Sequence, residues 1–325
     1  MTLVAHNNLY MAARVCIYMG EERNSTYDPT KVTDEMCLRV SKSSYTQYAM
    51  CPRQYWWNKI ALPDLEFKSS DAAIRGTAIH QVMEDALREV SLDKEKSVGV
   101  NTQMHNSFNK HAIAQGVETE VGVDALCEIL GEVADAWGHF EIVELEDKHT
   151  IPHTIKVLVP NEEYAIMPKT VSYPVELVGM IDGVFRHPDG HLVVVELKTG
   201  NANQSKLSRT RGELCYYRKL LMLAGYDEPT HFLTIFPDAD DAEFMLKLEG
   251  KRNTELFYGL SQGIAVYEKV NKRSITAMEK KLNNSVHGIM TQEWPIKWNE
   301  YFCTQWCDFH LSCNEELIGV DNDEL

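Results

Sequence analysis

Apolar and polar positions form their clearest pattern between Val178 and Gly200, where two apolar segments flank residues 187–190, His-Pro-Asp-Gly. Pro-Asp-Gly favours a turn, because proline presets φ, aspartate hydrogen-bonds its own backbone and glycine accepts positive φ. The pattern therefore predicts a β-hairpin. Its first strand ends near Asp182 to Phe185, and its second strand runs from His191 to Lys198.

Charged side chains end this apolar hairpin. Because side chains alternate across a strand, Glu196 and Lys198 lie on one face, and Asp182 on the first strand can reach the same point. Two carboxylates can hold Mg²⁺ or Mn²⁺, which polarises a phosphoryl oxygen and lowers the pKa of a bound water. A lysine there can position that water or stabilise developing charge. The alternative interpretation is a surface hairpin with an ordinary Glu196–Lys198 ion pair.

Apolar residues at helical spacing predict further elements on both sides of the hairpin. A helix that starts at Ser43 or Ser44 should break at Pro52, which lacks a backbone donor. The other expected helices are Asp71 to Val90, two stretches between Lys94 and Lys148 that include Glu132 to Phe140, Arg209 to Ala224, and Asn253 to Val270. The expected strands are short segments from Ile151 to Pro174, then His231 to Phe236 and Glu243 to Leu248.

Composition indicates a soluble globular protein of one large domain or two, with 325 residues, 44% hydrophobic and 25% charged. No apolar run of about 18 residues predicts a membrane helix, and an intracellular location is expected. The net charge of −16 is unexpected for a nucleic-acid-binding protein, because phosphate contacts dominate such affinity. Cations would have to gather locally, and Lys206, Arg209 and Arg211 directly follow the hairpin. They face a substrate in one interpretation and are a solvated helix face in the other.

Three cysteines lie within eleven residues near the C-terminus, at Cys303, Cys307 and Cys313. In an intracellular protein such a group favours metal ligation over disulfides, and Cys51 is the natural fourth ligand. Thiolates bind either zinc or an iron–sulfur cluster, and spacing leaves both open. Cys127 and Cys215 are expected to be buried small hydrophobes.

Several of these motifs together resemble a known family. Gly179-x-x-Asp182 and Glu196-Leu197-Lys198 resemble the GxxD and ExK core of the PD-(D/E)XK nuclease superfamily, and in particular its RecB-like branch. Gly76-Thr77-Ala78-Ile79-His80 resembles the family's G-x-x-x-H motif. Glu213 to Tyr217 resembles its Q-x-x-x-Y motif, with glutamate in place of glutamine. From the residues alone, His80 would be a satisfied core or surface histidine and Glu213–Tyr217 a helix-surface contact.

The cysteines resemble those of the iron–sulfur nucleases of this branch, such as AddB and the CRISPR-associated RecB-like exonucleases. Cys51-Pro52-Arg53 precedes the hairpin and three cysteines follow it, as in that group. The usual C-x2-C-x5-C spacing is here C-x3-C-x5-C, so Cys303 is displaced by one residue. The resemblance implies a four-iron–four-sulfur cluster on Cys51, Cys303, Cys307 and Cys313, with zinc as the alternative occupant.

The resemblance also implies the fold and the domain limits. We expect an α/β fold, with a restriction-endonuclease-like mixed β-sheet flanked by helices, helical elaborations, and a cysteine-ligated cluster joining N- and C-terminal elements. Residues 41–313 would form a single nuclease domain. Residues 1–40 would be an N-terminal extension, and residues 314–325 an acidic tail.

The resemblance implies roles for individual residues. His80, Asp182, Glu196 and the carbonyl of Leu197 would hold Mg²⁺ or Mn²⁺. Lys198 would activate water, and Glu213 and Tyr217 would position the substrate or the lysine. We further expect Glu84, one turn after His80, to orient that histidine, and Lys206, Arg209 and Arg211 to contact DNA.

The function implied is a metal-dependent DNA nuclease, and an exonuclease acting on single strands or ends is expected. The nuclease would serve recombination, repair or viral DNA processing, in the cytoplasm or, for a viral protein, in the host cytoplasm. No membrane association is expected, and a protein partner in a recombination or repair complex is. One alternative is a non-catalytic DNA-end-binding subunit of a recombination complex. Another is a zinc-stabilised hydrolase acting on a different phosphate ester.

Overall fold

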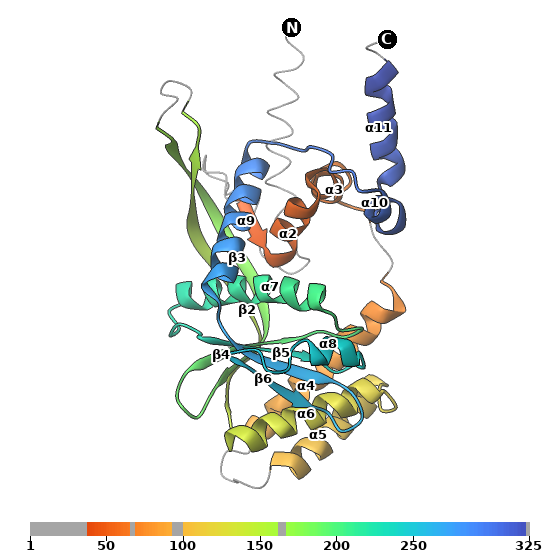
Figure 1. Ribbon diagram of the computed structural model, residues 1–325, viewed down its shortest axis with the longest axis vertical. Helices are drawn as coiled ribbons and strands as arrows, with labels where there is room; N and C mark the ends of the chain where they lie inside the picture. Colours follow the sequence, from red (N-terminus) through yellow and green to blue (C-terminus); the bar gives the residue numbers. More distant parts are fainter. Residues whose placement is uncertain (1–37, 66–68, 93–99, 162–166, 323–325) are drawn as a thin grey trace. The chain divides into compact units, whose positions relative to one another are not determined.

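The computed structural model describes residues 38–65, 69–92, 100–161 and 167–322 (Figure 1). The chain divides into two compact units that interleave along the sequence. The sheet unit comprises Lys68–His149 and Gly179–Met278, and the cysteine unit comprises Met1–Phe67, Thr150–Val178 and Glu279–Leu325. Cys16, Cys37 and most of the expected N-terminal extension lie outside the described residues. The domain limits at residues 40 and 313 stay predictions.

Seven strands in the described part of the chain form one mixed sheet, which confirms the predicted fold class. Their order is β1-β3-β4-β5-β7-β6, and β2 pairs with β3. The strands are β1 (Leu38–Ser41), β2 (Glu141–Val159), β3 (Lys169–Arg186), β4 (Leu192–Leu197), β5 (His231–Phe236), β6 (Thr254–Tyr258) and β7 (Ile264–Lys269). β4 and β5 are parallel, whereas β3 with β4, β5 with β7, and β6 with β7 are antiparallel.

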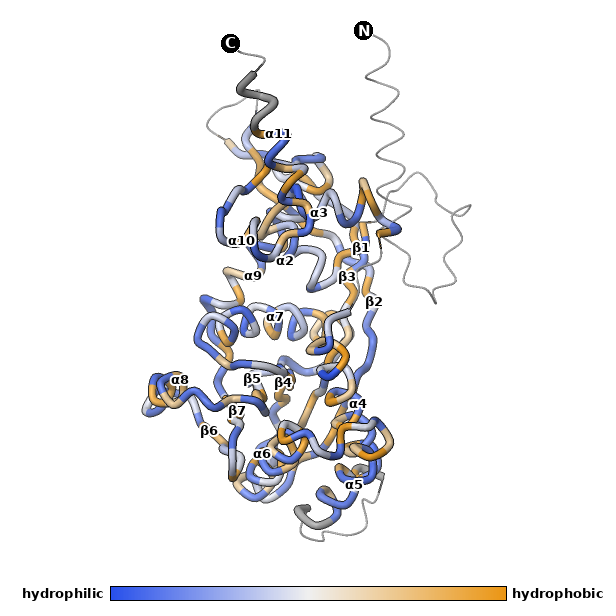
Figure 2. Tube along the Cα trace, turned by 90° about the vertical axis from the view of Figure 1, so that its right-hand side faces the viewer, coloured by the Kyte–Doolittle hydropathy of each residue, from blue (hydrophilic) through white to orange (hydrophobic). Residues whose placement is uncertain are grey.

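The central hairpin forms as the sequence predicts. β3 and β4 pair in the register Gly183↔Val195, and Gly190 in the connecting turn has φ +92°. Every residue of β4 is buried, because helices cover both faces of the sheet. This double burial explains the continuous apolar run, which Figure 2 shows as hydrophobic along most of β4.

Helices form layers on both faces of the sheet unit. α4 (Asp71–Leu92), α5 (Val100–Gln115) and α6 (Val121–Trp137) lie on one face, and α7 (Gln204–Leu223) lies on the other (Figure 1). The larger core fills the space between the sheet and α4–α6. Its members from the strands include Phe185, Val193, Val195, Leu197, Leu233 and Ile235, and those from the helices include Ile79, Val82, Met83, Phe108, Leu126 and Leu130.

Two predicted elements in the C-terminal half were wrong. The expected strand at Glu243 to Leu248 is the short helix α8 (Ala242–Leu246), whose first turn is capped by Asp241. The expected helix from Asn253 to Val270 is the hairpin β6–β7. The segment holds two runs of strand-like alternation separated by glycines, and Gly263 has φ +89°, a conformation that a continuous helix would not contain. The segments expected between Ile151 and Pro174 belong to the much longer strands β2 and β3.

The cysteine unit packs N-terminal helices against C-terminal ones. It contains α2 (Lys42–Met50), α3 (Pro52–Trp56), the π-helix η2 (Trp57–Ala61), the end of α9 (Lys272–Met290), α10 (Glu300–Trp306) and α11 (His310–Asn322). The predicted break at Pro52 is confirmed, since Cys51 ends α2 and precedes α3. The Tyr48 hydroxyl donates to the Glu293 carbonyl at 2.6 Å, and Tyr55 stacks on Trp294.

None of the helices in the described ranges combines the length and the apolar composition that a membrane crossing needs.

Candidate active site

The two hairpin carboxylates meet where β3 and β4 lie side by side. Asp182 and Glu196 each occupy the position next to the paired residues Gly183 and Val195, and their exposed fractions are 8% and 1%. The Leu197 N–H donates to Asp182 Oδ2 at 2.8 Å, which fixes that carboxylate. Burial and the charge of Glu196 raise the pKa of Asp182. Two buried carboxylates at one point therefore favour a bound cation.

His80 reaches the same point from α4. Its Nδ1 lies 3.4 Å from Glu146 Oε1 and 3.6 Å from Asp182 Oδ2. Burial lowers the pKa of His80, but its hydrogen bond to Glu146 and the nearby carboxylates outweigh burial and raise it. The imidazole thus belongs to the acidic cluster rather than to the apolar core.

Gly76, the first residue of the G-x-x-x-H motif, sets the approach of α4. A Cβ at this position would lie 2.9 Å from Thr199 Oγ1, in the loop that follows β4. Glycine therefore lets α4 come close enough for His80, one turn later, to reach Asp182. Asp238 reinforces this arrangement, because it accepts two hydrogen bonds from Arg75 on α4 and one from the Gly200 N–H.

Glu146 is a member of the site that sequence patterns did not indicate. The ligand atoms of His80, Glu146 and Asp182 all lie within 4.8 Å of one another. Glu146 has φ +50° inside β2, a conformation that costs a non-glycine residue about 1–3 kcal/mol. The buried Leu145 next to it accepts a hydrogen bond of 2.6 Å from Arg88 on α4. No motif surrounds Glu146, so only the fold brings it to the cluster.

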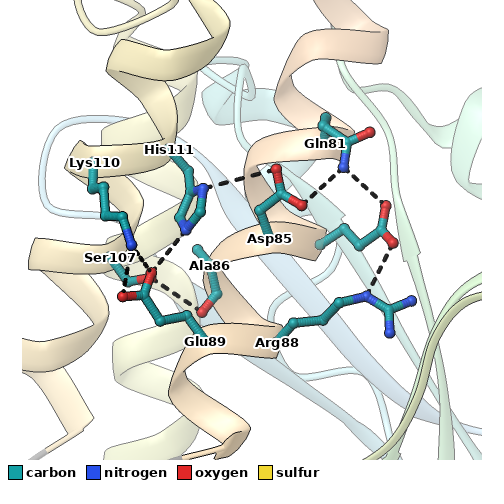
Figure 3. Close-up of polar contacts among 9 residues, drawn as sticks. Gln81, Asp85, Ala86, Arg88, Glu89, Ser107, Lys110 and His111 are labelled. Carbon is teal, nitrogen blue, oxygen red and sulfur yellow. Dashed lines mark hydrogen bonds and ion pairs between the residues drawn. The ribbon is translucent and has the colours of Figure 1, made fainter.

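Glu84 makes contacts other than the expected one with His80. It accepts hydrogen bonds from Gln81 at 3.2 Å and from Arg88 at 3.0 Å. Figure 3 shows another face of α4, which faces α5 and where Glu89 contacts side chains of that helix. These polar contacts hold α4 in place, and Glu146 rather than Glu84 contacts the histidine.

Lys198 lies between two carboxylates. Its Nζ donates to Glu196 Oε1 and lies 2.9 Å from Glu213 Oε2 on α7. Glutamate in the Q-x-x-x-Y position therefore gives the lysine a second anionic partner, which an amide would not provide. Tyr217, one turn later and 4% exposed, has its pKa raised strongly by burial and by the charges of Glu196 and Asp182. Its phenol therefore stays protonated and neutral at the site.

Gly179, the glycine of the GxxD motif, allows α7 to approach β3. A Cβ there would lie 2.4 Å from Leu220 Cδ1 and 3.1 Å from Tyr217 Cε1. A Cβ contact of 2.4 Å does not occur in real structures, so a larger residue would force the Leu220 side chain or α7 itself to move. The motif glycine thus positions the helix that carries Glu213 and Tyr217.

A cavity of about 650 Å³ opens beside His80 and Glu146. His80, Glu146, Gly76 and Thr199 line it, together with Met180 of β3. It gives a ligand access to His80 and Glu146 from outside the sheet unit. A phosphate group with its neighbouring sugar is well within its size.

Comparison with known proteins identifies the chain. Residues 39–314 match the family model of the PD-(D/E)XK nuclease superfamily. The chain belongs to this superfamily. No curated protein sequence matches it. Among solved structures, the crystal structure of SSO0001 is similar at 11% identity, with 95% of each chain covered and a TM-score of 0.35. That likeness adds nothing to the superfamily assignment.

As a PD-(D/E)XK protein the chain is a nuclease that acts on DNA, and its acidic cluster can hold a metal. Such nucleases generally use Mg²⁺ or Mn²⁺. The structure brings together His80, Asp182, Glu196, Lys198 and Glu213, five of the residues that the sequence singled out. Tyr217 lies close enough to interact electrostatically with these charged groups, and the Leu197 N–H donates a hydrogen bond to Asp182.

Two of the three cations expected to contact DNA make contacts within the protein. Lys206 Nζ donates to the carbonyl groups of Thr199, Gly200 and Asn201 and so supports the loop after β4. Arg211 forms a two-bond ion pair with the buried Glu268, at 2.6 and 2.7 Å. Arg209 is exposed. The predicted DNA contacts of these three residues stay predictions.

A second group with metal-binding side chains lies in the turn of the central hairpin, at His187, Asp189 and His191. The two imidazole rings are stacked, with centroids 4.4 Å apart and an interplanar angle of 16°. Lone pairs of stacked rings run parallel instead of converging on one ion. The Asp189 N–H donates to His187 Nδ1, and His191 Nε2 contacts the Tyr267 hydroxyl at 2.7 Å. We interpret this group as a polar stack that stabilises the turn.

All four cysteines assigned by the resemblance lie in the cysteine unit and are 5–8% exposed. Cys51 stands between α2 and α3, Cys303 lies in α10, Cys307 ends α10, and Cys313 lies in α11. None of them is in a disulfide. Cys127 and Cys215 are 2% and 0% exposed, which confirms that they are buried.

Backbone N–H groups point at two of these sulfurs. The Asn299 N–H donates to Cys303 Sγ at 3.4 Å, and the Phe309 N–H donates to Cys307. The Trp57 indole nitrogen is buried near Cys313 and has no hydrogen-bond partner of good geometry among the described residues. Burial raises the pKa of Cys307 and of Cys313, and the Phe309 N–H acts on Cys307 in the opposite direction. Charge interactions link Cys307 to Cys303 and Cys51 and link Cys313 to Cys307 and Cys51, so the four sulfurs are neighbours.

Proposed function

We propose that this PD-(D/E)XK nuclease hydrolyses DNA phosphodiester bonds with Mg²⁺ or Mn²⁺, and that it acts as a RecB-like exonuclease on single strands or DNA ends. The observation that carries the proposal is the convergence of Asp182, Glu196 and Lys198 on one buried point beside a cavity. The alternative is a non-catalytic DNA-end-binding subunit. A binding subunit has no use for a partly buried lysine held between two carboxylates, so the arrangement favours catalysis.

The donor set fits a hard divalent cation. Carboxylate oxygens and one imidazole lie within 4.8 Å of one another, and the pKa of Asp182 is raised by burial and by the charge of Glu196. His80, Glu146 and Asp182 would hold the ion, with Glu196 and the Leu197 carbonyl as the further ligands that the superfamily motif implies. When bound, the ion supplies Lewis-acid polarisation of the phosphate and lowers the pKa of a bound water.

The protein's own groups prepare the rest of the reaction. Glu196 and Glu213 hold the Lys198 ammonium at a fixed point, where it can orient the attacking water and stabilise charge on the phosphoryl oxygens. The Leu197 N–H keeps Asp182 from rotating. Tyr217 contributes a neutral phenol, which is suited to a phosphate oxygen or to Glu213.

For the cysteines we propose a four-iron–four-sulfur cluster in place of zinc. The four sulfurs are buried and neighbour one another, and the order of Cys51 before the hairpin and three cysteines after it resembles that of the iron–sulfur nucleases of this superfamily. Backbone N–H donors to Cys303 and Cys307 suit thiolate ligands of a cluster. The cluster would join N- and C-terminal helices of the cysteine unit.

End-labelled DNA tests the activity. Wild-type protein with Mg²⁺ or Mn²⁺ should release short products from labelled single strands, leave a circular single strand intact, and lose activity in EDTA. Asp182→Asn should be at least about 100-fold slower, the scale for losing a preorganised electrostatic group. Cleavage of the circular single strand would show that the protein is an endonuclease rather than an exonuclease. No cleavage of any substrate by the metal-loaded wild type would favour the binding subunit.

The biological setting is part of the same proposal. Exonuclease action at DNA ends serves recombination, repair or viral DNA processing, and a protein partner in such a complex is the accompanying expectation. Iron and sulfide analysis with a visible absorption spectrum would decide between the cluster and zinc.

A further inference from the structure

A second cavity, of about 570 Å³, lies in the sheet unit between α7, the loop before β6, the end of β7 and the start of α9. Its lining is polar along most of its extent. The residues that line it are Ser208, Arg211, Phe232, Lys251, Arg252, Asn253, Thr254, Glu268, Lys269, Val270, Asn271, Lys272 and Ser274. We call it the basic pocket.

The charge of the basic pocket opposes that of the chain. Five cations line it against the single carboxylate Glu268, in a protein whose net charge is −16. Glu268 is already bound by Arg211 through two hydrogen bonds. In the described part of the chain, Lys251, Arg252, Lys269 and Lys272 form no ion pair, and Lys251 has only a 3.4 Å contact with Gln204. Four like charges around one hollow repel each other unless an anion lies between them.

Neutral donors complete the wall. α9 begins at Lys272, and Asn271 caps it by accepting a hydrogen bond of 2.8 Å from the Arg273 N–H. Asn271 also accepts from the Ser274 and Ile275 N–H groups, so the first turn of this 19-residue helix contributes the partial positive charge of its N-terminus beside the lysines. Hydroxyl groups of Ser208, Thr254 and Ser274 are the other lining donors. Ammonium, guanidinium and hydroxyl groups beside a helix N-terminus are groups that bind phosphate.

The backbone around the pocket is held in a defined shape. Asn253 adopts φ +62° and its carbonyl accepts a hydrogen bond of 3.2 Å from the Lys269 N–H. Thr254 pairs with Glu268 in the β6–β7 ladder. The loop with Lys251 and Arg252 is thereby fixed next to the end of β7, which carries Lys269, so the cations do not depend on a mobile tail.

We propose that the basic pocket binds phosphate groups of the DNA backbone outside the reacting site. This inference rests on the proposed function, since it takes DNA as the substrate. It also explains how an acidic chain can bind DNA. Lys206 and Arg211, which the sequence favoured as DNA contacts, are engaged within the protein, whereas four cations with no carboxylate partner among the described residues gather in the basic pocket.

Two matched double variants test the proposal. The pocket variant is Lys269→Gln with Lys272→Gln. The control is Lys110→Gln with Lys247→Gln, which removes the same two charges from exposed lysines paired with Glu89 and Glu243. Binding of a fluorescein-labelled thymidine oligonucleotide, alone and annealed to its complement, is measured by anisotropy in EDTA over a range of salt.

The pocket variant should bind the single strand at least about 10-fold more weakly near 0.1 M salt, and the slope of log Kobs against log salt should fall by about 1.4. The control should stay within about twofold of wild type. At saturating DNA with Mg²⁺ the pocket variant should keep the wild-type kcat and show a raised KM.

A pocket variant with wild-type Kd and slope, in a protein that cleaves DNA, would overturn the proposal. Loss of inorganic phosphate binding with unchanged DNA affinity would also overturn it, by assigning the pocket to a small anion. A wild-type protein that binds the strand through these lysines but never cleaves it would instead contradict the proposed function and leave the pocket assignment standing.

Discussion

Replacing Glu146 with glutamine tests the one residue that the fold adds to the metal site. The substitution keeps the shape of the side chain and removes its charge. Glu146 Oε1 is 3.4 Å from His80 Nδ1, and its ligand atom lies within 4.8 Å of those of His80 and Asp182. We therefore expect Glu146→Gln to weaken divalent-metal binding without disturbing the hairpin.

The size of the effect follows from the geometry. Two unit charges about 4 Å apart at an effective dielectric of about 20 interact by about 4 kcal/mol. The ion carries two charges, but the open cavity admits screening water and the glutamine oxygen remains a weak ligand. A net loss of about 2–3 kcal/mol is expected, which corresponds to a rise in Kd of about 30- to 150-fold.

Mn²⁺ binding to metal-free protein, followed by electron paramagnetic resonance or calorimetry, measures this directly. Glu243→Gln is the control, because it removes the same charge from an exposed residue of α8 that pairs with Lys247. Glu146→Gly should also lose metal affinity, yet raise the stability in EDTA by about 1 kcal/mol, since glycine accepts the φ of +50°. A Mn²⁺ Kd for Glu146→Gln equal to that of Glu243→Gln would refute the assignment.

Three further substitutions test other parts of the account. Gly179→Ala should lower the free energy of unfolding in urea by about 1–3 kcal/mol, because its Cβ meets Leu220 and Tyr217. Gly212→Ala in α7, which has open space around it, should instead raise that free energy by about 0.5–1 kcal/mol. Equal effects of the two substitutions would contradict the close approach of α7 at Gly179. Cys307→Ala should lose the iron and lower the free energy of unfolding by about 3 kcal/mol or more, whereas the control Cys215→Ala should keep the iron. Full iron content in Cys307→Ala would contradict the cluster assignment. Burial and the nearby His191 and Lys269 lower the pKa of His231 to about 4 in the folded protein. As the pH drops from about 6.5 towards 4, this histidine binds a proton in the unfolded chain but not in the folded one, so the stability of the protein should fall. In His231→Gln this loss of stability at low pH should be smaller by about 1–2 kcal/mol, a figure reduced for solvent screening of the half-buried ring. If the pH dependence of Tm is the same in His231→Gln as in wild type, another group is responsible.

The hairpin and its charged end could be predicted from sequence because the information is local. Pro-Asp-Gly sets the turn, and the period of two puts Glu196 and Lys198 on one face whatever surrounds them. The motif glycines were recognisable as a pattern, but their reason is tertiary. Gly76 and Gly179 matter because Thr199, Leu220 and Tyr217 lie against them.

Other features depend on contacts between distant segments. Glu146 joins the site through a left-handed residue inside a strand, and no spacing rule marks such a residue. Lys206 and Arg211 look like free cations in the sequence because their partners, the carbonyls after β4 and Glu268, come from other elements. The β6–β7 hairpin was mistaken for a helix because its two short apolar runs also fit helical spacing, and only the pairing with β5 decides between them.

The central claim is that Lys198 acts in chemistry at a metal-holding carboxylate site. Comparing Lys198→Met with wild type in two assays, Mn²⁺ binding and Mg²⁺-dependent cleavage of a labelled single strand, tests that claim most directly. We predict a Mn²⁺ Kd within a few-fold of wild type and a cleavage rate at least about 100-fold lower, since the lost ammonium lies between Glu196 and Glu213 and is not itself a ligand. Cleavage by Lys198→Met at a rate near that of wild type would contradict the account.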